Sequence, residues 1–188
     1  MTDFSSPHNN IGYLCTDWQL QRGLGGKTAL KLIDKDENLS EYTFAQLTNL
    51  SNQAANLLAS YGFQKSDRIM LLLSKTVEMY AFFLGALKLG LISCILFNSI
   101  GEDSIVERIK DTDTKAIIST SRMNFRLVKV LQKLDPSFKV LLVDEDQPDG
   151  QFIGIRDQFA QSTTEFVTPD TDPGQYSHFH FTSGSTGK

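Results

Sequence analysis

The chain has 188 residues, and its 18 Lys and Arg against 22 Asp and Glu give a formal net charge of −4 at neutral pH. This charge provides no basic field for nucleic acid or an anionic membrane surface, so we expect neither as a partner. Cys15 and Cys94 are far apart and form no C-x-x-C pair, which argues against a disulfide framework or a zinc knuckle and favours the reducing cytoplasm. Residues 1–10 lack the basic and apolar parts of a secretory signal, so export is not expected.

Strand-like and helix-like segments alternate along the chain. Thr43 stands at an N-cap position, and the apolar residues after it recur at helical spacing until Gly62, which is placed to end the helix in a left-handed conformation. In chain order we predict a strand over 28–34, a turn over 34–38, a helix over 43–58, a strand over 68–73, a helix over 76–89, a strand over 91–97, a helix over 102–111, a strand over 115–119, a helix over 122–134, a strand over 139–143 and a short helix over 155–160. This alternation predicts an α/β fold with a mostly parallel sheet and helices on both faces.

Residues 79–97 form a long apolar run in which Lys88 is the one charged residue. A membrane span is the alternative to a buried helix followed by a buried strand. We favour the second, because a lysine at the centre of a lone span costs about 3 kcal/mol and Gly90 has the character of a helix stop. The helix over 76–89 has apolar residues on nearly all faces, so we expect it to leave an exposed apolar patch where its cover is missing.

An acidic cluster lies in the polar segment after residue 143. It consists of Asp144, Glu145, Asp146 and Asp149. A calcium loop is one interpretation, but Pro148 occupies a ligand position and no glutamate follows at the EF-hand offset. We therefore interpret the cluster as a solvated acidic turn.

Basic residues recur at helical spacing in the predicted helix over 122–134. They are Arg122, Arg126, Lys129 and Lys133, set opposite Phe125, Val128 and Leu131. A membrane-surface helix is one interpretation. The solvated outer face of an ordinary α/β helix is favoured, because the apolar stripe is modest.

His178 and His180 fall on one side of a predicted strand, a spacing that a metal pair could use. No third Cys, His or carboxylate follows within the next few residues, so we predict no metal site. We interpret both as strand residues beside the loop that follows. The sequence supports no Ser/His/Asp triad, and we assign no catalytic residue within the chain.

The last residues form a loop of glycines and hydroxyls with a lysine: Thr182, Ser183, Gly184, Ser185, Thr186, Gly187 and Lys188. Glycines allow positive φ and close backbone approach, so successive N–H groups can face one concavity, while the hydroxyls add donors and the lysine adds charge. This composition suits a polyphosphate. A Walker A loop is excluded by spacing, and an unstructured Gly/Ser linker is disfavoured by the strand-like residues 178–181 that lead in.

This loop resembles the nucleotide-phosphate loop of the adenylate-forming enzymes, the family of the acyl-CoA synthetases and their relatives. Upstream segments 41–58, 65–69 and 83–90 resemble the same family in the same order. Further segments, among them residues 107–111, are most similar to the acetyl-CoA synthetase branch. Ile95 departs from the proline that many relatives carry, and the family's prominent loop lysine would lie two residues beyond Lys188.

The resemblance implies a ligase that works in two steps. A carboxylate, with acetate or another short acid favoured, attacks the α-phosphate of Mg²⁺-bound ATP, and the thiol of coenzyme A then displaces AMP from the acyl adenylate. Residues 182–188 would hold the ATP phosphates. The resemblance also implies that residues 1–188 are the N-terminal part of an AMP-binding domain and inactive alone, since the family's ribose-binding, hinge and catalytic-lysine segments have no counterpart here.

Two alternatives to a CoA ligase remain open at this point. One is an adenylation domain of a peptide-synthetase or acyl-carrier system, which a carrier domain with a serine attachment site would reveal. The other is a short non-catalytic protein that binds a nucleotide or a partner.

Overall fold

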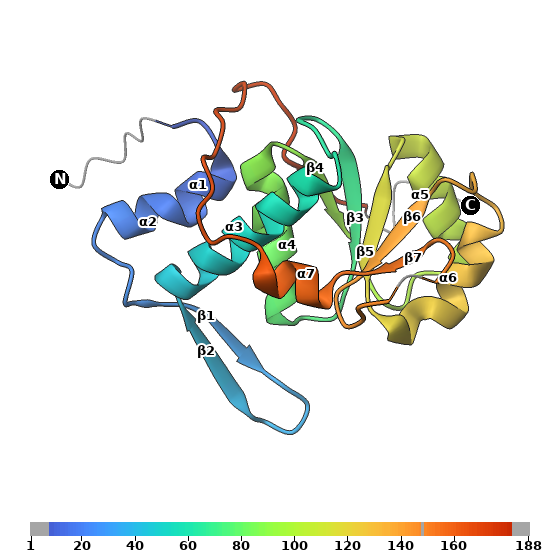
Figure 1. Ribbon diagram of the computed structural model, residues 1–188, viewed down its shortest axis with the longest axis horizontal. Helices are drawn as coiled ribbons and strands as arrows, with labels where there is room; N and C mark the ends of the chain where they lie inside the picture. Colours follow the sequence, from blue (N-terminus) through green and yellow to red (C-terminus); the bar gives the residue numbers. More distant parts are fainter. Residues whose placement is uncertain (1–7, 148, 182–188) are drawn as a thin grey trace.

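A six-stranded sheet forms the middle of the structure (Figure 1). The computed structural model describes residues 8–147 and 149–181. The strands are β3 (Arg68–Leu72), β4 (Ile92–Ile95), β5 (Ala116–Ser119), β6 (Lys139–Leu142), β7 (Phe152–Gly154) and β8 (His178–Phe179). Their order is β7-β6-β5-β3-β4-β8, and every neighbouring pair is parallel. The predicted α/β fold with a mostly parallel sheet is confirmed.

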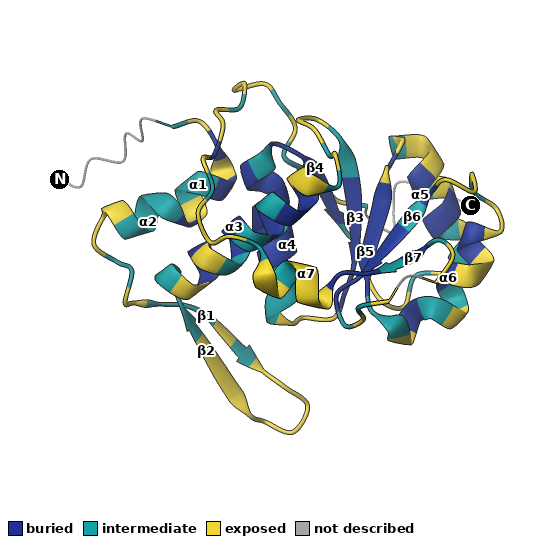
Figure 2. Ribbon diagram, viewed as in Figure 1, coloured by how far each residue is buried: buried dark blue, intermediate teal, exposed yellow. Residues whose placement is uncertain are grey.

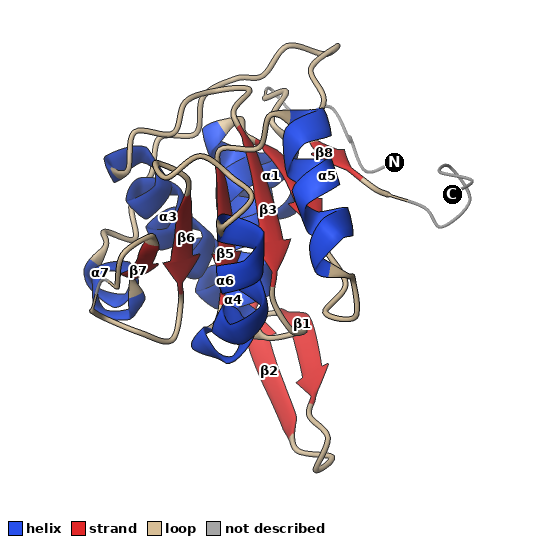
Figure 3. Ribbon diagram, turned by 90° about the vertical axis from the view of Figure 1, so that its right-hand side faces the viewer, coloured by secondary structure: helices blue, strands red, loops and turns tan. Residues whose placement is uncertain are grey.

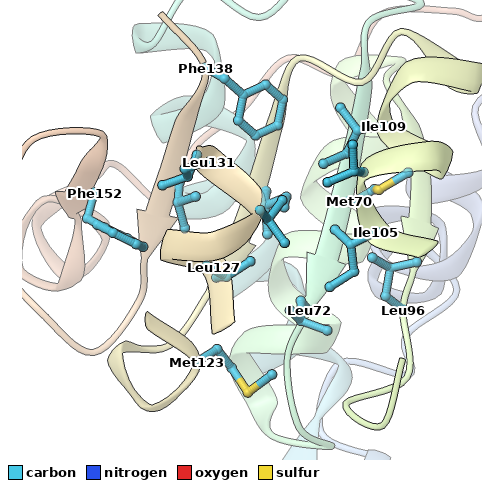
Figure 4. Close-up of a cluster of buried hydrophobic side chains, with 14 of the residues drawn as sticks. Met70, Leu72, Leu96, Ile105, Ile109, Met123, Leu127, Leu131, Phe138 and Phe152 are labelled. Carbon is cyan, nitrogen blue, oxygen red and sulfur yellow. The ribbon is translucent and has the colours of Figure 1, made fainter. Parts of the chain in front are cut away.

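Helices cover both faces of this sheet, and β3 shows why. Its side chains alternate between the faces, and each face buries an apolar cluster. Met70 and Leu72 pack with α5 (Glu102–Thr112) and α6 (Asn124–Leu131), as Figure 4 shows. Ile69 and Leu71 pack with α3 (Phe44–Ser60) and α4 (Val77–Leu89). Figure 2 shows the strands buried between the helices, and Figure 3 shows α5 and α6 in front of them.

The ends of α3 and α4 follow the predicted signals. The Thr43 hydroxyl accepts a hydrogen bond from the Gln46 amide at 3.2 Å, and the Gln46 side chain accepts one from the Thr43 amide at 2.9 Å. Gly62 and Gly90 follow the two helices with φ of 84° and 78°. Thr76 is the N-cap of α4, but its side chain makes no capping hydrogen bond.

The apolar run over 79–97 divides into α4 and β4. No helix in the described part of the chain is long and apolar enough to cross a membrane. α4 has eight buried residues, so the rest of the chain covers it well. The prediction of an exposed apolar patch on α4 was therefore wrong. The exposed large apolar side chains among the described residues include Ile33, Leu39, Phe97, Phe125 and Val128, all on other elements.

Several short elements escaped the sequence analysis. α1 (Ile11–Cys15), α2 (Asp17–Gln21) and β2 (Leu39–Thr43) were not predicted. β2 pairs with the predicted strand β1 (Thr28–Ile33) in a hairpin that projects from the rest of the structure (Figure 1). The predicted helix over 122–134 is a 3₁₀ turn (Ser121–Met123) followed by α6, and the short helix near 155–160 is α7 (Arg156–Gln161). Helices of five residues and strands of three, such as α1 and β7, are too short to show a clear periodicity.

A buried lysine joins the N-terminal helices to this framework. Lys88 of α4 is fully buried, and its Nζ lies 2.6 Å from Asp17 Oδ2 and donates to Asn52 Oδ1. Asn10, also buried, donates to the Lys88 carbonyl at 3.0 Å. A Cβ added at Gly12 would lie 2.6 Å from the Lys88 amide nitrogen, so α1 and α4 pack at backbone contact. A charge without a partner would be costly there, and Asp17 compensates it.

Candidate functional site

The strand order creates a topological switch point beside β3. Its neighbours are β4 on one side and β5 on the other. The connection from β3 to β4 runs through α4 on one face, and the next two connections run through α5 and α6 on the opposite face. The connections therefore diverge at the carboxyl ends of β3 and β5, which is where open α/β sheets bind their ligands.

A pocket of about 350 Å³ lies at this switch point. Ser74 follows β3, Asn98 follows β4 and Thr120 follows β5, and all three line it. Arg122 and Phe125 line its other side. This pocket was not predicted from the sequence, although polar residues directly after three buried strands are a signal that could have indicated it.

The two arginines of this pocket differ in what they contact. Arg126 donates to the Asn98 carbonyl, and its Nε lies 3.4 Å from Glu102 Oε1, so it fixes the loop after β4 and the start of α5 to α6. Arg122 is exposed and makes no hydrogen bond or ion pair with any residue that the structure describes. Its guanidinium is therefore free to bind an anion.

The predicted solvated basic face of this helix needs correction. Arg126 is only 14% exposed and serves as a structural link. The apolar stripe opposite it was also misassigned in part: Phe125 and Val128 are 70% and 43% exposed, whereas Leu127 is fully buried. The Leu127 side of the helix packs against the sheet. Together with Met123, this side carries more apolar residues than the side of Phe125.

The predicted phosphate loop, residues 182–188, lies outside the described residues, but the strand before it is described. β8 pairs with β4 through His178 with Ser93 and Phe179 with Cys94. Because the strands are parallel, the chain after Phe179 runs toward the same edge of the sheet as the switch-point pocket. Residues 178–181 thus lead to the edge where a ligand is expected.

A second pocket, of about 410 Å³, lies where the described chain reaches Phe181. The Arg108 guanidinium carbon stands 4.6 Å from the centre of the Phe181 ring, a cation–π contact. Phe97 and His180 also line this pocket. The segment before the predicted loop is therefore held against α5 and the end of β4.

His178 and His180 are neighbours, as their spacing predicted. Their ring centres lie 4.9 Å apart, and His178 Nδ1 is 2.8 Å from the Ser177 hydroxyl. Among residues 8–147 and 149–181, no group of three or more His, Cys, Asp or Glu is arranged to hold a metal ion.

The interpretation of the acidic cluster as a solvated turn was wrong in part. Asp144 accepts hydrogen bonds from the amide and hydroxyl of Ser121, both at 2.8 Å. Asp146 pairs with Arg156 and accepts a hydrogen bond from the Asp157 amide at 2.8 Å. These two carboxylates stabilise the starts of helical segments, which is a favourable place for negative charge.

The two cysteine thiols have raised pKa values. Burial raises the pKa of Cys94 to about 11, an effect that outweighs the opposing charge of Arg108. The pKa of Cys15 is also raised by partial desolvation, although this residue lies at the surface. Because the reactive species is the thiolate, neither thiol is activated at neutral pH.

The doubly wound sheet, with a pocket at its switch point and a glycine-rich sequence after an edge strand, is typical of α/β proteins that bind their ligands at the carboxyl edge. The family model for AMP-binding enzymes matches residues 17–188, and the chain belongs to that family. The resemblance seen in the sequence is thereby confirmed.

Relatives cover most of this chain. Acetyl-coenzyme A synthetase of Bacillus subtilis is 31% identical over 180 residues, which is 95% of this chain and 31% of that protein. The crystal structure of an acyl-CoA synthetase of Brucella canis matches 97% of this chain and 33% of its own, with 24% identity and a TM-score of 0.82. The anthranilate CoA ligase AuaEII, in complex with anthranoyl-AMP, also has a TM-score of 0.82, with 20% identity, and covers 97% of this chain and 34% of its own. The chain spans about a third of the length of these relatives.

Proposed function

We propose that this chain is the N-terminal portion of the AMP-binding domain of an ATP-dependent, AMP-forming acid:CoA ligase in the cytoplasm. The observation that carries the proposal is the family match, which runs through residue 188 and so includes the predicted phosphate loop. Acetate or another short acid is the favoured substrate, because curated relatives of this chain are acetyl-coenzyme A synthetases. Since the chain spans about a third of those relatives, we expect it to need further residues for catalysis.

In this proposal, residues 182–188 bind the β- and γ-phosphates of Mg²⁺-bound ATP. Backbone N–H groups, hydroxyls and Lys188 would orient the α-phosphate for in-line attack by the carboxylate. The same donors would stabilise the charge on the departing pyrophosphate. Coenzyme A would then displace AMP to form the thioester.

The switch-point pocket favours coenzyme A over a carrier protein as the acyl acceptor. Coenzyme A carries a base and phosphates at the end remote from its thiol, whereas a carrier protein presents no such nucleotide. The guanidinium of Arg122, which pairs with no group in residues 8–147 or 149–181, suits a phosphate, and the exposed ring of Phe125 suits a base. We therefore propose that Arg122 binds a phosphate of coenzyme A.

The loop can be tested in a chimera in which residues 1–188 replace the matching segment of the Bacillus subtilis relative. Replacing Gly184 or Gly187 with valine is expected to lower acetate-dependent ATP–pyrophosphate exchange about a hundredfold, because a branched side chain blocks positive φ and close phosphate approach. Thr186→Ala should be milder, at about 1 kcal/mol or roughly fivefold, since it removes one donor. The melting temperature of each variant is measured beside its rate.

Gly26→Val is the matched control, because a Cβ at Gly26 meets no atom within 4 Å. It should leave the exchange rate unchanged. Residues 1–188 alone should release no pyrophosphate when incubated with acetate, ATP and Mg²⁺. Full exchange activity in both loop-glycine variants would remove the phosphate role of the loop, and an inactive parent chimera would count against the ligase itself.

Arg122→Ala should raise the KM for coenzyme A about tenfold in the same chimera, because a charged hydrogen bond to phosphate is lost. The ATP–pyrophosphate exchange rate should stay unchanged, since coenzyme A takes no part in that half-reaction. Lys129→Ala, an exposed change outside the pocket in α6, the helix that follows Arg122, is the control and should alter neither value. An unchanged KM for coenzyme A in Arg122→Ala would contradict the assignment.

A further inference from the structure

Residues 163–175, here called the strap, connect opposite edges of the sheet. The strap follows α7, which comes directly after the edge strand β7, and leads to β8 at the other edge. It contains no helix or strand. In Figure 1 it passes α3 and α1 before it reaches the far side of the sheet. Its own backbone forms no ladder, so its position depends on contacts with other elements.

Two asparagines of α3, one turn apart, hold the beginning of the strap. Asn52 Nδ2 donates to the Thr164 carbonyl at 2.7 Å. Asn56 Nδ2 donates to the carbonyls of Thr163 and Glu165, at 2.9 and 2.8 Å. Three successive carbonyls of the strap are thus bound by one face of one helix.

The N-terminal segment holds the middle of the strap. Asn10 Nδ2 donates to the Pro169 carbonyl at 3.1 Å, and the Thr171 hydroxyl donates to the Asn9 carbonyl at 2.6 Å. These contacts join the buried group around Lys88, because Asn52 accepts from Lys88 Nζ and Asn10 donates to the Lys88 carbonyl. The strap is therefore fixed to the same polar centre that joins α1, α3 and α4.

β8 is weakly held by its own pairing. Its ladder with β4 contains two residue pairs, extended by a hydrogen bond of 3.1 Å from the Ser93 amide to the Ser177 carbonyl. Few hydrogen bonds hold this strand, so its stability depends on the segment that delivers it. We propose that Asn52 and Asn56 are positioning residues that fix the strap on α3 and thereby hold β8 beside β4. The consequence for ATP binding rests on the proposed function, whereas the positioning of the strap and β8 by the two asparagines does not.

Hydrogen exchange followed by mass spectrometry on the full chain tests this role. Asn56→Asp keeps the shape of the side chain but removes both donated hydrogen bonds. Asn52→Asp keeps an acceptor for Lys88 and removes the donor to Thr164. Gln53→Ala is the control, because Gln53 lies on the same helix and donates to the Ala160 carbonyl in α7, before the strap.

In both aspartate variants, amides of residues 163–181 should exchange about tenfold faster, while β5 exchanges at the parent rate. The control should change neither region. Faster exchange limited to residues 163–167 would overturn the proposal, because the strap would then loosen without effect on β8. Equal acceleration in β5 would also overturn it, since the asparagines would then act on global stability. If Asn52→Asp fails to fold, the half-buried Asn56 still provides the test.

A kinetic measurement extends the test to the proposed function. In the chimera described above, Asn56→Asp should raise the KM for ATP about threefold and leave the KM for coenzyme A unchanged. If amide hydrogen exchange in β8 became faster while the KM for ATP stayed unchanged, the proposed link between the strap and ATP binding by residues 182–188 would be overturned. An inactive parent chimera would instead reject the proposed function, and hydrogen exchange alone would then decide the positioning role.

Discussion

Replacing Asp17 with asparagine is expected to lower the free energy of unfolding by about 3 kcal/mol. The change keeps the shape of the side chain but leaves the buried Lys88 ammonium without its counter-charge. Removal of one partner from a buried pair is far more costly than the pair's net contribution, because the remaining charge stays desolvated. Breaking a buried pair usually costs about 3 to 5 kcal/mol. We expect the lower value here, since the Asp17 side chain is 22% exposed. Denaturant unfolding at neutral pH measures the loss.

Glu41→Gln is the matched control. Lys31 and Glu41 lie at the same separation of 2.6 Å, but their side chains are 60% and 40% exposed on the hairpin. An exposed pair of this kind contributes about 0 to 1 kcal/mol, so the control should change stability little. Equal losses in the two variants would contradict the role assigned to burial.

The pH dependence of stability provides an independent check on Lys88. Burial lowers the pKa of Lys88 from 10.5, and the neighbouring Asp17 opposes this shift. Between the folded-state pKa and 10.5 the unfolded chain therefore binds more protons than the folded chain, so stability contributed by this group rises with pH across that window. Lys88→Met should lack this rise. A difference in the free energy of unfolding between the parent and Lys88→Met that stays constant with pH across this window would contradict the lowered pKa of Lys88.

Replacing Gly85 with valine should destabilise the fold by about 3 kcal/mol, the upper end of the usual cost of overpacking. An added Cβ would lie 2.7 Å from both Ala54 Cβ and the Ser51 carbonyl oxygen, and 2.9 Å from the Ala55 amide nitrogen. Two of these are backbone atoms of α3, so no side-chain rotation can relieve the clash. α3 and α4 must therefore move apart. Thermal and denaturant unfolding of the variant measure the effect.

Gly26→Val again serves as the control, since its Cβ meets open space. It should change the free energy of unfolding by less than about 0.5 kcal/mol. Gly85→Ala should fall between the two, because the better helix propensity of alanine offsets about 1 kcal/mol of the clash. A Gly85→Val protein as stable as the parent would show that the two helices can separate freely.

Much of the fold was predictable because burial leaves a direct pattern in the sequence. The run from Arg68 to Leu72 is apolar because both faces of a central parallel strand are covered. Thr43 with Gln46, and Gly62 after α3, mark helix ends through local hydrogen bonds and backbone conformation, so both appeared as expected. Membership of the AMP-binding family followed from motifs in the same order, and the role of residues 182–188 stays a prediction.

The sequence by itself determined the α/β class, the order of the long elements and the family, because each depends on local pattern. Only the tertiary structure decided which face of α6 is buried, since Phe125 and Leu127 belong to competing stripes and packing against the sheet selects one. It also decided the partners of Lys88 and the contents of the switch-point pocket. Asp17, Asn52 and Lys88 lie far apart along the chain, and Ser74, Asn98 and Thr120 meet because parallel strands end at one edge. Such groups are brought together by long-range packing, which no local spacing records.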